Sequence, residues 1–134
     1  MLFYSFAKKI LDLITGQASS VAVSGGLFLG LSTTTPAADG TNITEPSGNG
    51  YARSLLGAYG QALTIKMTVP SAGETTNDEM IFFPEATGSW GTITHVVLYD
   101  STGEKIAFAA LTSSITPSSG VVIIRASSFT LTAS

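Results

Sequence analysis

The residues of this chain that could support hydrolytic chemistry are its serines, a single histidine and a nearby aspartate. His95 is the only histidine, and Asp100 ends the same alternating run, ITHVVLYD. A Ser-His-Asp site needs the histidine as base, a carboxylate that orients it and a serine that it activates. In a strand, however, positions 95 and 100 point to opposite faces, and the chain has no Gly-x-Ser-x-Gly turn. We therefore predict a structural role for His95, at a half-buried sheet position or in an intersubunit hydrogen bond, with a pH-sensitive contact as the alternative.

A second candidate site lies in the segment DGTNITE, which offers oxygen ligands of the kind that calcium prefers. Asp39, Asn42 and Glu45 are these ligands, but their spacing is not that of an EF-hand loop. The same residue types are also common in turns. We therefore predict a turn-rich, solvated loop and no metal.

Carbohydrate binding is a further alternative, because several aromatic residues could form a platform for sugar rings. Trp90, Tyr51, Tyr59 and Tyr99 are the candidates. A lone tryptophan in a Gly-Ser-Trp-Gly turn is more often a core residue or an interface anchor. A glycan-binding module stays the alternative function from another class, with a glycan as a candidate partner. No motif indicates an enzyme or a cofactor, and we predict neither.

The composition is apolar and poor in charge. Hydrophobic residues make up 44% of the 134 residues, the mean hydropathy is +0.37, and charged residues make up 11%, where about 25% is usual. A formal charge of −3 with six basic residues argues against a nucleic-acid partner. The lack of cysteine excludes disulfides and cysteine-based zinc sites, and no apolar run approaches the roughly 20 residues of a membrane span. Such a composition suits a protein whose surface is covered by copies of itself.

Two segments outside the expected strands are candidates for contacts with other subunits. Residues 1–16 predict an amphipathic helix, because Phe3, Phe6 and Ile10 recur at helical spacing. This helix either covers an end or edge of its own sheet or docks on a neighbouring subunit. Residues 33–50 are dense in turn formers, and a loop of this length is often a binding arm.

The remainder of the chain alternates short apolar strands with turns. Strands are expected at 26–32, 51–57, 61–69, 79–83, 92–100, 104–111, 120–126 and 128–133. Pro84 is expected to close the 79–83 strand or to place it at an edge. One face of the 92–100 strand should carry Ile93, His95, Val97 and Tyr99. We predict a single domain over residues 1–134 that is mainly β, namely an antiparallel β-sandwich, jelly-roll-like, with one N-terminal amphipathic helix.

Three stretches resemble a recurring pattern of one protein family. LFLGLSTTTPAADGTNITEPSGNGYAR (27–53) joins a strand ending in Gly-Leu-Ser-Thr to a Glu-Pro-Ser-Gly-x-Gly-Tyr-Ala-Arg block. IFFPEATGSWGTITHVVLYD (81–100), and KIAFAALT with the closing FTLTA, follow in the order that the family shows. On these motifs the chain resembles the small virion structural proteins of tailed bacteriophages, described as tail-fibre-like or as capsid accessory proteins. It departs from the pattern at 96–99 and in the tight hairpin DSTGEKI.

The resemblance implies an assembly protein without turnover or cofactor. We expect a capsid decoration or cement protein that stabilises the capsid lattice, placed at the capsid surface of the virion and made in the cytoplasm of the bacterial host. A tail, fibre or baseplate component is the alternative. The expected partners are copies of itself, in a homotrimer, and the major capsid protein or tail proteins. The candidate interface residues are Phe3, Phe6, Ile10, Asp39, Asn42, Glu45, Tyr51, Arg53, Trp90 and His95.

Overall fold

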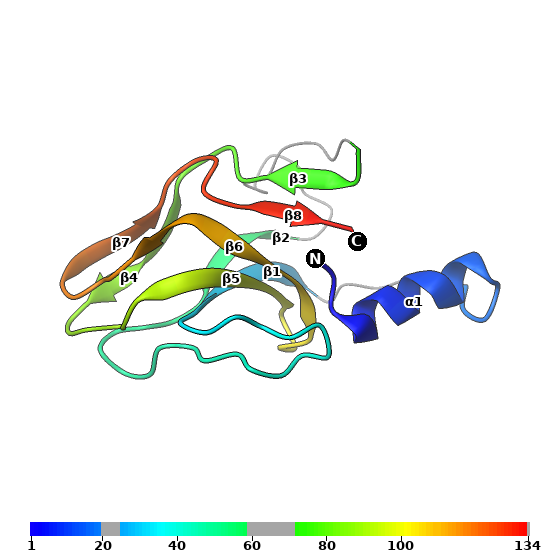
Figure 1. The fold of residues 1–134 in the computed structure, drawn as a ribbon, viewed down its shortest axis with the longest axis horizontal. Helices are drawn as coiled ribbons and strands as arrows, with labels where there is room; N and C mark the ends of the chain where they lie inside the picture. Colours follow the sequence, from blue (N-terminus) through cyan, green and yellow to red (C-terminus); the bar gives the residue numbers. More distant parts are fainter. Residues whose placement is uncertain (20–24, 59–71, 134) are drawn as a thin grey trace.

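The chain folds into antiparallel β-strands that follow a helix at its N-terminus (Figure 1). The computed structural model describes residues 1–19, 25–58 and 72–133. Within these ranges α1 (Tyr4–Ile14) is the only helix. The mainly β class with one N-terminal helix is thereby confirmed, whereas the finer prediction of a jelly-roll-like β-sandwich stays a prediction. The strand expected at 61–69 and the candidate Tyr59 lie outside the described residues.

The largest sheet has four antiparallel strands in the order β2-β1-β5-β6. Its strands are β1 (Gly26–Ser32), β2 (Ser54–Ala58), β5 (Ile93–Asp100) and β6 (Lys105–Ile115). Two antiparallel pairs accompany this sheet: β3 (Glu74–Thr76) with β8 (Thr130–Thr132), and β4 (Ile81–Ala86) with β7 (Gly120–Ile124). Figure 1 shows β3 and β8 on one side of the four-stranded sheet and the 33–50 loop on the other.

The main core lies between the four-stranded sheet and the two strand pairs. Its large buried side chains are Leu29, Leu31, Leu56, Ile81, Phe83, Trp90, Ile93, Val96, Leu98, Ile106, Val122, Ile124, Phe129 and Leu131. The period of two is clear in β4, where Ile81 and Phe83 are buried and Phe82 between them is exposed. This alternation places one face of a strand on the core and the other toward solvent.

The other face of the four-stranded sheet carries a second apolar cluster. Its buried members are Phe3, Val97 and Tyr99, with Phe28, Ile43 and Phe108 packed against them. Ile43 belongs to residues 33–50, which we call the covering loop because they cross this face (Figure 1). Strand β5 is therefore covered on both faces, by the main core on one side and by this cluster on the other.

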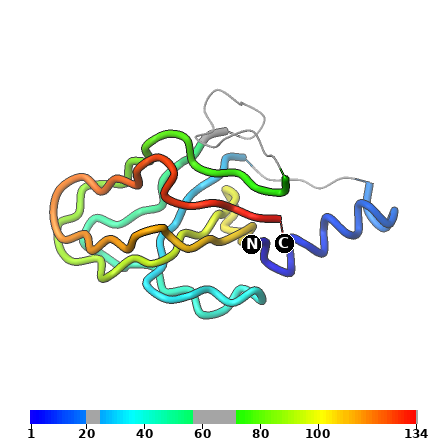
Figure 2. The backbone as a smooth tube through the Cα atoms, turned by 45° about the horizontal axis from the view of Figure 1, so that its top comes forward, coloured from blue at the N-terminus to red at the C-terminus, as the bar shows by residue number. Residues whose placement is uncertain are grey.

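The first residues of the chain extend the four-stranded sheet beyond β6. The Phe108 N–H donates to the Met1 carbonyl at 2.9 Å, and the Phe3 N–H donates to the Ile106 carbonyl at 3.1 Å. This pairing covers part of the open edge of β6, which would otherwise present free backbone groups. It also carries the Phe3 ring into the second cluster, where it lies 5.0 Å from the Phe108 ring between centres. Figure 2 shows that the two ends of the chain lie close together beside this edge.

Helix α1 then leaves the sheet and projects from the β body (Figures 1 and 2), and none of its residues is buried. Phe3 is its N-cap residue in extended conformation and supplies no side-chain cap. The Tyr4 N–H instead donates to the Ala38 carbonyl of the covering loop at 2.9 Å, which satisfies one of the helix's unpaired donors. The helix is thus present as predicted, but the placement of Phe3 on its apolar side is wrong, because Phe3 precedes the helix and is buried in the second cluster.

Irregular strand pairing decides the outcome of two local predictions. Pro84 does not close its strand, because β4 runs to Ala86, and its register with β7 shifts between Phe83 and Glu85. The alternative, that Pro84 lies in an edge strand, is confirmed, because within the described residues β4 pairs with β7 in a two-stranded sheet. The residue without an N–H thus occupies a bulge in a two-stranded pair, where it is tolerated. The predicted face of Ile93 is wrong. Ile93 does not share a face with Val97 and Tyr99 but lies in the main core, since the pairing of β5 with β6 shifts between Ile93 and His95. In addition, β3 forms within residues 70–78, which were expected to be a loop.

The burial of Phe3 leads to a stability prediction. We expect Phe3→Ala to lower the free energy of unfolding by about 3–5 kcal/mol, because it empties a filled core position. Tyr4→Ala is the matched control, since Tyr4 is 63% exposed and Phe3 only 1%, and we expect it to change stability by no more than about 0.5 kcal/mol. Urea unfolding followed by circular dichroism measures both. Equal effects of the two substitutions would contradict the placement of Phe3 in the core.

Candidate functional site

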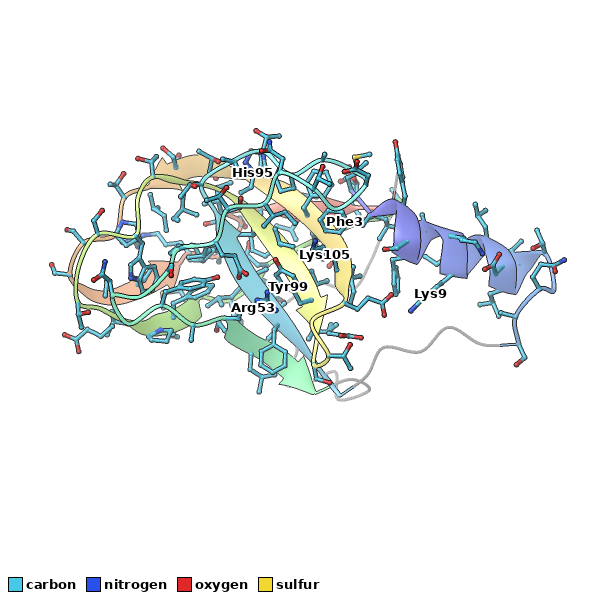
Figure 3. The ribbon with its side chains drawn as sticks, turned by 90° about the horizontal axis from the view of Figure 1, so that it is seen from below. Phe3, Lys9, Arg53, His95, Tyr99 and Lys105 are labelled. Atoms are coloured by element: carbon cyan, nitrogen blue, oxygen red, sulfur yellow. The ribbon has the colours of Figure 1, made fainter. Side chains whose placement is uncertain are left out.

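The covering loop is bonded to its own sheet at several points. The Thr33 N–H donates to the Thr44 carbonyl at 3.0 Å and joins the two arms of the loop. Lys105 Nζ, from β6, donates to the Gly40 carbonyl at 2.7 Å. Figure 3 shows the loop in front of the strands, with Lys105 beneath it. The segment expected to act as an arm therefore lies on the protomer's own sheet, and its contact with a neighbouring subunit stays a prediction.

A bidentate ion pair fixes the end of the covering loop. Arg53 donates from Nη2 to Glu45 Oε2 at 2.8 Å and from Nε to Glu45 Oε1 at 3.0 Å. The Tyr51 hydroxyl donates to the same Oε1 at 2.8 Å and accepts the Leu31 N–H at 3.0 Å. The guanidinium of Arg53 lies over the Tyr99 ring, 3.5 Å from its centre (Figure 3). Glu45 is therefore the group at which the loop, β1 and β5 meet.

Gly30 in β1 makes room for this carboxylate. A Cβ atom at position 30 would stand 2.6 Å from Glu45 Oε1 and 2.9 Å from the Tyr99 ring. A residue without a side chain therefore allows the loop to approach the strand this closely. The glycine within the apolar 26–32 segment is the sequence signal for such an approach.

The titratable groups of the cluster have pKa values that are shifted away from neutral pH. Burial alone raises the pKa of Glu45, but the hydrogen bonds from Arg53 and Tyr51 outweigh it and keep that pKa below its usual value. The hydrogen bond to Glu45 raises the pKa of Arg53. Burial raises the pKa of Tyr99 to about 12 and also raises the pKa of Tyr51. A general acid or base requires a pKa near the working pH, so this arrangement suits a fixed contact between loop and sheet rather than proton transfer.

Trp90 is buried beside this cluster, with 3% of its surface exposed. Its ring meets the Tyr51 ring edge-on at 5.2 Å between centres, and its Nε1 donates to the Asn49 carbonyl at 2.8 Å. The side chain therefore packs under the return of the covering loop. A buried ring of this kind offers no open face on which a sugar could stack.

The other two oxygen ligands of the loop do not join Glu45. Asp39 Oδ1 accepts the Thr41 N–H at 3.0 Å and the Thr41 hydroxyl at 2.6 Å, and the hydroxyl bond is the main cause that lowers the pKa of Asp39. Asn42 has a left-handed φ of 59° and donates from Nδ2 to the Thr35 carbonyl at 2.8 Å. Both side chains shape turns. In the described part of the chain, no three His, Cys, Asp or Glu side chains are grouped to hold a metal ion.

His95 and Asp100 take part in separate local networks. His95 Nδ1 lies 2.8 Å from the Thr94 hydroxyl oxygen, and burial lowers the His95 pKa. Asp100 Oδ1 accepts the N–H groups of Thr102 and Glu104 at 2.9 and 3.0 Å and shapes the turn between β5 and β6. Figure 3 places His95 away from the Arg53 and Tyr99 pair.

The structure thus unites Glu45, Tyr51 and Arg53. Trp90 packs against Tyr51 beside this group, and Phe3 shares the second cluster with Tyr99. The other candidates lie elsewhere. Phe6 and Ile10 are half-buried on α1, where Lys9 pairs with Glu104 at 2.6 Å. Sequence reasoning named Tyr99 only as part of a candidate sugar platform, and it missed Gly30, Ile43 and Lys105 as members of the site. For Lys105 the sequence contains no local signal, because its partner Gly40 lies far away along the chain. In the described ranges, no helix is long and apolar enough to cross a membrane.

Glu45 should make stability depend on pH. A carboxyl group whose pKa is lowered by folding stabilises the folded state above its ordinary pKa, and this stabilisation is lost as the pH falls through the lowered value. We expect Glu45→Gln to lower the free energy of unfolding by about 1–3 kcal/mol at pH 7. The difference from wild type should shrink below about pH 4, near and under the ordinary glutamate range.

Urea unfolding at a series of pH values from 7 to 3 measures this difference. Glu74→Gln is the control, because Glu74 is exposed at the surface and should differ little from wild type throughout. A deficit of Glu45→Gln that stays constant down to pH 3 would show that the carboxylate charge does not hold the loop.

Comparison with known families agrees with the resemblance of the sequence motifs. The model of the family described as Podophage GP4 fiber I protein gp80 matches residues 3–133, a range that begins before α1 and ends after β8. A search of curated proteins finds no match to the chain. Since the family match covers nearly the whole sequence, the chain belongs to the Podophage GP4 fiber I protein gp80 family, a family of tailed-phage virion structural proteins.

Proposed function

We propose that this chain is a structural subunit of a podophage fibre and that it works as a homo-oligomer, with a trimer as the expected state. The observation that carries the proposal is apolar surface left open by the single protomer. Helix α1 exposes Leu11 and Ile14, and the β4–β7 pair exposes Phe82, Val121 and Ile123. The description of the matching family as a fibre protein favours the fibre over other places in the virion.

Physical chemistry supports an assembled rather than a solitary protomer. Large exposed apolar patches on a soluble protein mark contacts with other molecules. A chain with 11% charged residues also has little charge with which to keep such patches dispersed in water. Obligate interfaces are apolar and often bury more than about 2,000 Å², and identical subunits usually close such contacts by symmetry. No turnover or cofactor enters this role.

Capsid decoration is the second candidate function. Helix α1 projects from the β body instead of lying on it (Figure 1), and a projecting helix suits a protein that connects neighbours in a lattice. The 134 residues also contain no internal fibrous repeat. In this alternative the partner is the major capsid protein, and the protein lies at the capsid surface.

The position of the protein in the virion separates the two functions. Purified virions are labelled with a gold-conjugated antibody against the recombinant chain and imaged by electron microscopy. We expect label at the fibres. Label spread over the capsid shell would replace the fibre by capsid decoration, and virions without label would remove both.

The oligomeric state is tested on the isolated chain. Size-exclusion chromatography with light scattering should give three times the 13.8 kDa mass of the protomer. A dimer or higher oligomer would keep the self-association but correct the trimer. A protomer mass at micromolar concentration would contradict self-association.

A further inference from the structure

Helix α1 presents an apolar face that its own protomer leaves open. Leu11, Leu13 and Ile14 are exposed, Ile14 by 72%, and no residue of the helix is buried. A helix of 11 residues is marginal in water unless it packs against another surface. Its apolar face therefore requires a partner surface in the assembled protein.

Lysines border this apolar face on both sides. Lys8 is four residues from Tyr4 and three from Leu11, and Lys9 is four residues from Leu13, so each lysine is a surface neighbour of these apolar side chains. Lys8 pairs with an aspartate of the same helix, but it is 73% exposed, and exposed pairs of this kind contribute little energy.

The charges of the chain are divided between the helix and the rest. Helix α1 holds two lysines and one aspartate, whereas the other eight acidic and four basic side chains lie outside it. The helix is therefore cationic, and the remainder of the chain is anionic. A partner surface with apolar side chains and an acidic border would match the helix in both respects.

The outer face of the β4–β7 pair has these properties. Phe82 stands opposite Ile123 in the register, Glu85 stands opposite Val121, and all four side chains are exposed. Further exposed residues at this end are Met80, Asp78, Glu79 and Arg125. The three carboxylates outnumber the single guanidinium, so the border of the apolar face is net acidic.

We propose that α1 of one copy docks on the outer face of β4–β7 of a second copy. The proposal rests on the self-association proposed above and names its contact. Two β4–β7 faces placed against each other would bring their acidic borders together, whereas the helix brings the exposed Lys8 to such a border. Lys9 stays paired with Glu104 of its own protomer and therefore adds no charge to this contact. Figure 1 shows α1 and the β4–β7 pair at opposite ends of the protomer. The contact therefore joins unlike surfaces of two copies, which closes a ring or continues into a row.

A rival surface for the helix lies beside β8. This apolar hollow is lined by Leu2, Leu98, Ile106 and Leu131, with Glu74 as the acidic residue of its lining. This hollow lies beside the start of the same protomer's helix, since Leu2 is one of its lining residues. It has one carboxylate, whereas the β4–β7 border has three. The charge match therefore favours β4–β7.

Cross-linking tests the contact cleanly, because the chain has no cysteine of its own. The double variant Ile14→Cys with Val121→Cys is treated with a bifunctional maleimide at low protein concentration and run on a denaturing gel. We expect products of two or more protomers. The single variants Ile14→Cys and Val121→Cys are the controls and should give far less product, since the contact joins unlike surfaces. The pair Ile14→Cys with Ala133→Cys tests the hollow beside β8 in the same way.

A charge exchange supplies the second readout. Lys8→Glu in the Ile14→Cys, Val121→Cys background should lower the cross-linking yield about two- to fivefold, the effect of losing one exposed charge pair. Adding Glu79→Lys should restore much of that yield. Equal yields in all three proteins would show that charge does not guide the helix to this face and would overturn the match on which the contact rests.

The mass of the untreated wild-type chain, measured by light scattering, separates the two levels of the proposal. A monomeric wild type that also gives no cross-links overturns self-association and the contact together. If the wild type is oligomeric but the single variants give as much cross-linked product as the double variant, the contact is overturned and self-association stands. The same conclusion follows if only the Ile14 and Ala133 pair cross-links.

Discussion

The Glu45 carboxylate is the group on which the covered face of the sheet depends. It accepts two hydrogen bonds from Arg53 and one from Tyr51, and Gly30 leaves the space in which it sits. Bidentate, charge-assisted bonds of this kind are stronger and more directional than an ordinary surface pair. Because the cluster is only partly buried, its contribution to stability comes from this bonding geometry rather than from a low local dielectric constant. Removal of either charged partner would leave the other half-buried without its counter-charge, which lowers stability.

The loop that this carboxylate holds in turn positions the start of the chain. Ile43 of the loop packs with the cluster that buries Phe3, and Ala38 accepts the first N–H of α1. Lys9 then ties the helix to the β5–β6 turn through Glu104. The direction in which α1 leaves the body thus follows from contacts made by the loop and the turn, together with the partial packing of Phe6 on the main core, since no residue of the helix is fully buried. A polar contact on the sheet face is in this way coupled to the surface that the helix presents.

The parts of this fold that the sequence predicts are those with a local cause. The bounds of β1 at 26–32 follow from its apolar residues and glycines. The spacing of Phe6 and Ile10 predicts the N-terminal helix, which spans Tyr4–Ile14 rather than the expected residues 1–16. The bulge at Pro84 and the face on which Ile93 lies were not predicted, because a register shift depends on the partner strand, which no local pattern reveals. The grouping of Glu45 with Tyr51 and Arg53 is near in sequence, but the Tyr99 ring beneath them is brought there only by the pairing of β1 with β5.

The charges beside the open apolar surfaces of this protein bear on which of these surfaces can pair with each other. An apolar face with neutral borders would bind any similar face, including its own copy, and such unspecific association is what isolated apolar patches risk. Here the β4–β7 face carries acidic neighbours and α1 carries basic ones. In the proposed contact, two like faces would repel and two unlike faces would attract, so the charges would decide which surfaces meet rather than how strongly they bind. Only 11% of the residues are charged, and in this proposal the basic charge of the helix and the acidic charge of the strand pair favour one orientation of assembly.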